Sequence, residues 1–159
     1  MNLKSKILTV FLLFFTVNLA AQESLKILES YILEDLQGER ISKRALPAKD
    51  LKWILEMYFE NTLIIPTEEE TFELVKSNFT LDDKFPADIE FHDFSFKANK
   101  RKNISLRFTL PLISKNRKYA VFYQERPCKR NLCGSGILIL MEKKDGKWIK
   151  KSILTGWIS

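Results

Sequence analysis

The stretch that decides the fold is residues 119–149, YAVFYQERPCKRNLCGSGILILMEKKDGKWI. It contains two β-rich runs, 119–125 and 136–142, with apolar side chains on both faces. Such runs are typical of central strands, which are buried on both sides. Asp145-Gly146 then precedes a short third run at 147–149, and Asp-Gly supplies the positive φ angles of a type I′ turn. The stretch therefore predicts consecutive antiparallel strands with short connections.

Two segments upstream show the same alternation of apolar and polar residues. Residues 88–96 alternate with a period of two, and Ile104, Leu106 and Phe108 continue that period up to Pro111. Both patterns predict half-buried strands. Together with the runs above, they predict a sheet of four to six strands.

The N-terminal half reads as helical. A first apolar stripe recurs at helical spacing after Ser24, which is a suitable cap; it consists of Leu25, Leu28, Ile32 and Leu36. A strand is the alternative there, because apolar residues at 25, 27, 31 and 33 also fit a period of two. A second stripe is formed by Leu51, Ile54, Leu55, Tyr58 and Phe59.

A third helix is indicated by Pro66-Thr67-Glu68-Glu69-Glu70, in which Thr67 and Glu70 have the spacing of a capping box. Helices first and strands afterwards predict an α+β fold, with N-terminal helices followed by an antiparallel meander. Residues 22–159 form a segment long enough for a single domain with its own core.

The first 21 residues have the pattern of an export signal. Lys4 and Lys6 precede an apolar run at 7–17, and Leu19-Ala20-Ala21 ends in small residues. The run is too short for a spanning helix, which needs roughly 20 apolar residues. We expect cleavage before Gln22 and a periplasmic or secreted bacterial protein with no membrane span in its mature form.

The two cysteines, Cys128 and Cys133, lie between two predicted strands. In an oxidising compartment an even number of cysteines favours a disulfide. A metal site would need further ligands, and a redox pair would typically be C-x-x-C beside a helix. We therefore expect a structural Cys128–Cys133 disulfide that pins the connecting loop.

Charge is distributed unevenly along the chain. The whole chain carries +6, but residues 22–96 hold 8 Lys/Arg against 17 Asp/Glu, and residues 97–159 hold 16 against 3. One interpretation is that the two halves pack together and offset each other's fields. The other is that the basic half presents a face to an anionic partner, such as an envelope component or another polyanion.

The second interpretation gives a candidate anion-binding set. It consists of Lys100, Arg101, Lys102, Lys129 and Arg130. A possible extension surrounds the Asp145-Gly146 turn and consists of Lys143, Lys144 and Lys147.

No motif in the sequence predicts a catalytic, cofactor or metal site. His92 is the sole histidine, so a Ser-His or Cys-His enzyme would have to use it. Ser135 lacks the glycines two residues before and after it that a nucleophile elbow requires, and Gly134 and Gly136 are expected as turn residues that start a strand. We expect a non-enzymatic exported binding protein. The alternative is an exported hydrolase or small-ligand carrier that uses the concave face of the sheet.

The C-terminal third also resembles a group of small secreted bacterial proteins. The resemblance rests on residues 108–114 (FTLPLIS), Tyr119-Ala120, Cys133-Gly134-Ser135-Gly136, Gly146-Lys147-Trp148 and Trp157-Ile158-Ser159. Thr109 and Ile113 stand where that pattern has serine and phenylalanine. The resemblance implies this fold and compartment and assigns no catalytic residue.

Overall fold

The computed structural model of the chain describes residues 22–36, 39, 41–42, 45–60, 68–83, 85, 105–128 and 133–158. Within these residues, three helices precede a five-stranded antiparallel sheet, which confirms the predicted α+β fold. The predicted leader at 1–21 and the predicted strand at 88–96 lie outside them. None of the described helices is long and apolar enough to cross a membrane.

The helices form at the predicted apolar stripes. Residues 22–35 are helical, which settles the first stripe in favour of a helix. It is followed by α2 (Ala48–Phe59) and α3 (Glu69–Asn78). α2 buries one face, made by Leu51, Ile54, Leu55 and Tyr58.

One predicted helix cap is wrong, and another lies outside the described residues. Ser24 lies inside its helix, because Gln22 and Glu23 are helical too, and its hydroxyl instead donates to the carbonyl of Pro111 at 3.4 Å. The N-cap of α3 is Glu68, whose side chain makes no capping hydrogen bond, and the predicted capping residue Thr67 lies outside the described residues. Interactions distant in sequence therefore replace the local capping pattern at Ser24.

The sheet is built on two long central strands. Its strands are β1 (Arg107–Phe108), β2 (Leu112–Ile113), β3 (Tyr119–Arg126), β4 (Ser135–Lys144) and β5 (Lys147–Ile158). The order is β1-β3-β4-β5, with β2 also paired to β3. Asp145 and Gly146 have φ angles of 50° and 77°, which confirms the predicted tight turn between β4 and β5.

One edge of the sheet is a broken strand. β1 and β2 both pair antiparallel with β3, and residues 109–111 between them end in Pro111, which has no N–H to donate. Beyond this edge, Ile41 and Leu46 form isolated parallel bridges to Leu106 and Thr109. The sequence patterns do not predict these parallel bridges.

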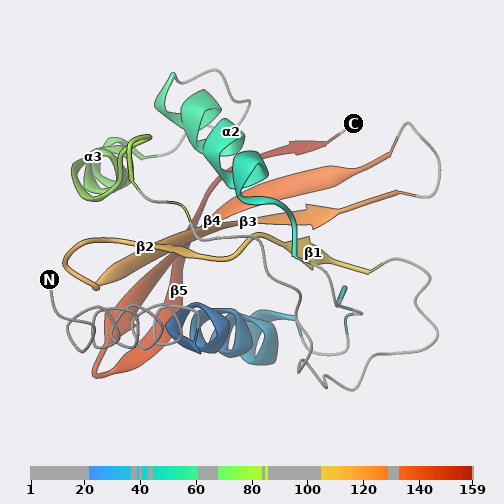
Figure 1. Ribbon diagram of the computed structural model, residues 1–159, viewed down its shortest axis with the longest axis horizontal. Helices are drawn as coiled ribbons and strands as arrows, with labels where there is room; N and C mark the ends of the chain where they lie inside the picture. The colour runs from blue at the N-terminus through green and yellow to red at the C-terminus, as the bar shows by residue number, and fades with distance from the viewer. Residues whose placement is uncertain are drawn as a thin grey trace, which may run out of the picture.

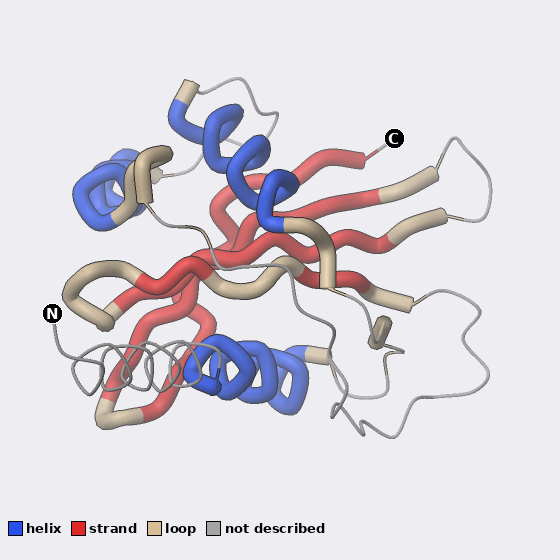
Figure 2. The backbone as a smooth tube through the Cα atoms, in the orientation of Figure 1, coloured by secondary structure: helices blue, strands red, loops and turns tan. Residues whose placement is uncertain are grey.

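Helices cover both faces of the sheet (Figure 1). The helix of residues 22–35 packs on one face, and α2 and α3 lie on the other, as the tube in Figure 2 also shows. Successive residues of β4 alternate between the two cores: Ile139 and Met141 face the first helix, whereas Leu138 and Leu140 face α2. β3 and β4 are therefore buried on both sides, as their composition predicted.

Candidate anion-binding surface

Two turns at the same end of the sheet carry basic side chains. The β2–β3 turn contributes Lys115, Arg117 and Lys118, and the Lys143 amide donates to the carbonyl of Lys118 at 2.8 Å. This bond places the β4–β5 hairpin beside the β2–β3 turn. The set Lys115, Arg117, Lys118, Lys143, Lys144 and Lys147 is here named the basic turn surface.

Hydrogen bonds within the β2–β3 turn hold its shape. The Arg117 amide donates to the Ser114 carbonyl at 2.8 Å, and the Lys118 amide donates to Oδ1 of Asn116 at 3.0 Å. Arg117 itself has φ 56°, in the left-handed region that non-glycine residues seldom occupy. The turn thus presents the Arg117 side chain, which is 66% exposed, from a fixed backbone.

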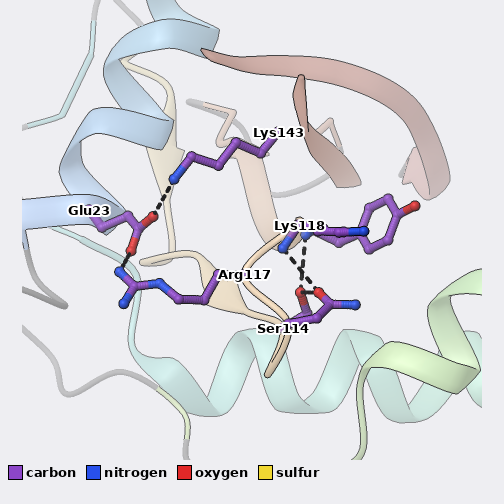
Figure 3. Close-up of polar contacts among 7 residues, drawn as sticks. Glu23, Ser114, Arg117, Lys118 and Lys143 are labelled. Carbon is purple, nitrogen blue, oxygen red and sulfur yellow. Dashed lines mark hydrogen bonds and ion pairs between the residues drawn. The ribbon is translucent and has the colours of Figure 1, made fainter. Parts of the chain in front are cut away.

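Glu23 bridges the two turns from the first helix. It lies between Arg117 and Lys143 (Figure 3) and accepts from the Arg117 guanidinium through Oε2 and from Nζ of Lys143 through Oε1 at 3.1 Å. Its side chain is only 12% exposed. Burial raises the pKa of the Glu23 carboxyl, but the hydrogen bonds from Arg117 and Lys143 outweigh burial and hold that pKa below its ordinary value.

The other cations of the surface differ in their partners. Lys144 Nζ lies 3.3 Å from a carboxylate oxygen of Glu142, and Lys115 Nζ lies 3.6 Å from one of Asp83. Within the described residues, no ion pair is found for the exposed Lys118 and Lys147. The surface therefore keeps an excess of positive charge after its internal pairs are formed.

Ion pairs also connect the acidic and basic halves elsewhere. Arg126 lies 3.6 Å from Glu39, and Lys150 pairs with Asp35. With the pairs made by Glu23 and Asp83, these contacts show that the acidic half offsets part of the basic charge. The first interpretation, that the two halves offset each other's fields, therefore holds in part for the described residues, whereas an anionic partner of the basic half stays a prediction.

The candidate anion-binding set from the sequence stays a prediction. Lys100, Arg101, Lys102, Lys129 and Arg130 are outside the described residues. Cys128 and Cys133 are bonded, with Cα atoms 5.2 Å apart, which confirms the predicted disulfide. The hairpin lysines lie at the opposite end of β4 from Cys133, because β4 runs for ten residues from Ser135 to Lys144.

The glycines near the disulfide have a different role from the predicted one. Neither Gly134 nor Gly136 has a positive φ. A Cβ on Gly136 would lie 2.1 Å from the Tyr123 hydroxyl and 2.5 Å from Nε1 of Trp157, and Nε1 donates to that hydroxyl at 2.9 Å. Gly136 is therefore required by the close approach of two aromatic side chains, and not by a turn.

Of His92 and Ser135, the two residues considered for catalysis, the structure describes only Ser135. His92 lies outside the described residues, and Ser135 is the first residue of β4, paired with Arg126 and Ile158. No group of three His, Cys, Asp or Glu residues suited to a metal ion occurs among the described residues. Burial raises the pKa of Tyr123 to about 12, so that phenol stays protonated at neutral pH.

Sequence patterns missed Glu23, Arg117 and Lys118 as site residues. A single acidic residue early in a predicted helix carries no local sign that it meets a turn 94 positions later. Comparison with known protein families, curated proteins and solved structures gives no match.

Proposed function

We propose that this protein is an exported, non-enzymatic binding protein that holds polyanions through the basic turn surface. The observation that carries the proposal is the meeting of six basic side chains on two adjacent turns, of which Lys118 and Lys147 make no ion pair within the described residues. Such a surface attracts anions without requiring a shaped pocket, and attraction of this kind weakens with salt.

The alternative, a hydrolase or small-ligand carrier on the concave face of the sheet, has less support. Helices pack on both faces of β3 and β4, and the inward side chains of both strands belong to the two cores. In the described part of the chain, the central strands therefore leave no open face for a substrate. We prefer the binding protein for this reason.

The proposed location is the periplasm or the cell exterior. The Cys128–Cys133 disulfide is compatible with an oxidising compartment, and the leader pattern at 1–21 supports export. N-terminal sequencing of the protein from its own host should give Gln22 as the first residue. An intact Met1 would contradict the proposed export.

Heparin chromatography tests the binding proposal. The wild type should be retained at low salt and elute earlier as salt rises. The double variant K118Q/K147Q should elute at lower salt than the wild type. The matched control K49Q/K52Q removes the same charge from the exposed side of α2 and should shift elution much less.

Two results would overturn the proposal: wild-type protein in the void volume at low salt, or equal shifts in both double variants. The triple variant K100A/R101A/K102A tests the sequence-predicted set separately. A loss of retention in that variant alone would place the binding surface there instead.

A further inference from the structure

Arg117 and Lys143 converge on one carboxylate from two different turns. Each contacts a different oxygen of Glu23, so the carboxylate is held at two points (Figure 3). Lys143 also makes a cation–π contact, with its Nζ 5.3 Å from the centre of the Trp148 ring. The two cations therefore form a preorganised site for a two-oxygen anionic group, and Glu23 fills it.

The backbone at Arg117 supports a role for its side chain. A left-handed conformation is unfavourable for arginine, whereas glycine or asparagine adopts it readily. Arg117 nevertheless occupies it, with φ 56°, and its guanidinium reaches Glu23. Residues held in strained backbone conformations cluster at functional sites.

We infer that Glu23 is an internal competitor that occupies the core of the polyanion site, and that the external ligand is an acidic glycan whose carboxylates displace it. This inference rests on the proposed function, and it names the ligand of that same surface and the residue that regulates its binding. The group that the two cations hold in the structure is a carboxylate, and uronate glycans carry carboxylates whereas nucleic acids do not.

The Glu23 carboxylate can separate from Arg117 and Lys143 at little cost in free energy. If the chain begins at Gln22, Glu23 is the second residue, and chain termini open locally at little cost. The Arg117 side chain in one of its two ion pairs is 66% exposed, and ion pairs with such exposed side chains contribute only modestly to stability. Release of Glu23 would add Arg117 and Lys143 to the unpaired cations Lys118 and Lys147.

Glu125 offers a control outside the basic turn surface. Like Glu23 it is largely buried, with 20% of its side chain exposed, and its Oε2 accepts from the Arg107 guanidinium at 2.6 Å. It lies at the opposite end of β3 from the β2–β3 turn, and Arg107 is not part of the basic turn surface. E23Q and E125Q thus make the same change in net charge at different places.

The test is binding of a sulfate-free oligogalacturonate, measured by calorimetry at low salt on the full mature chain. E23Q should bind about fivefold tighter than the wild type, because the ligand no longer has to displace the two ion pairs that Glu23 makes. E125Q should change affinity by less than about twofold, and E23Q/R117Q should return to the wild-type affinity or below. If E23Q folds poorly by circular dichroism, E23D serves instead, because its shorter side chain withdraws the carboxylate from both cations.

Equal gains in E23Q and E125Q would overturn the inference and leave general polyanion binding intact, because heparin retention tests that separately. A single-stranded oligonucleotide of equal charge bound more tightly by E23Q than the oligogalacturonate would also overturn the choice of ligand. Binding by E23Q with none by the wild type would support Glu23 as the competitor.

Discussion

Thr109 and Tyr123 are joined by two hydrogen bonds, one of which uses a side chain in place of the backbone. The Thr109 amide donates to the Tyr123 carbonyl at 2.9 Å, and the Tyr123 amide donates to Oγ1 of Thr109 at 3.0 Å. Both groups are buried. The threonine hydroxyl therefore satisfies a strand amide at the point where the edge strand is broken by residues 109–111.

Thr109→Val should destabilise the protein, because it leaves the buried Tyr123 amide without an acceptor. An unsatisfied buried group costs about 1–3 kcal/mol, which urea denaturation can resolve. Thr109→Ser keeps the hydroxyl and should cost less.

Thr155→Val is the matched control for that substitution. Thr155 is fully buried, and its hydroxyl has no hydrogen-bond partner among the described residues. Its replacement should leave stability unchanged or raise it, since no partner is lost. Equal losses in the two valine variants would show that methyl packing, and not the hydroxyl, decides the cost.

Gly136→Ala should destabilise the protein more than Gly134→Ala. The added methyl at 136 would meet the Tyr123 hydroxyl and the Trp157 ring nitrogen, whereas at 134 the nearest atom is a Trp157 ring carbon at 3.2 Å. Overpacking of this kind typically costs about 1–3 kcal/mol, measured as a change in the denaturation midpoint. A larger loss for Gly134→Ala would contradict a requirement based on the Tyr123–Trp157 contact.

Much of the fold can be predicted from the sequence, because the patterns that determine these elements are local. The apolar stripes of α2 and of the first helix, the two-sided composition of β3 and β4, and the Asp145-Gly146 turn all act within a few residues. The sequence patterns do not predict β2, and they predict only the first residues of β5, which runs to Ile158. β2 is two residues long and follows Pro111, so its pairing with β3 depends on tertiary contacts rather than on propensity.

The candidate site is less predictable than the fold. The uneven charge distribution indicated a basic surface, but charge totals do not say which cations are neutralised. Lys143 meets Glu23 across 120 positions, whereas the exposed Lys147 meets no carboxylate within the described residues. Only the three-dimensional arrangement distinguishes such lysines.

Replacing both Cys128 and Cys133 by serine should lower stability by about 2 kcal/mol, because the closed loop is short. The fold should persist, since both cores lie along the strands and the disulfide joins only their ends. Thermal denaturation monitored by circular dichroism measures both effects, and wild-type protein with its disulfide reduced should behave like the variant. Loss of a cooperative transition in either would contradict a modest, local role.

Acid should remove the stabilisation that Glu23 and Glu142 provide. In both carboxyls burial raises the pKa, but hydrogen bonds from neighbouring basic residues outweigh it, so the pKa in the folded state lies below the ordinary value of 4.5. A lowered folded pKa means that the contribution is complete above about pH 4.5 and is lost as pH falls through the folded pKa. The melting temperature of the wild type should therefore exceed that of E23Q/E142Q at pH 6, and the difference should shrink between pH 4.5 and pH 3.

The single variants should each show part of this convergence, because the two carboxylates have no cation in common. A difference that stays constant down to pH 3 would show that the ion pairs of these two carboxylates contribute nothing to stability.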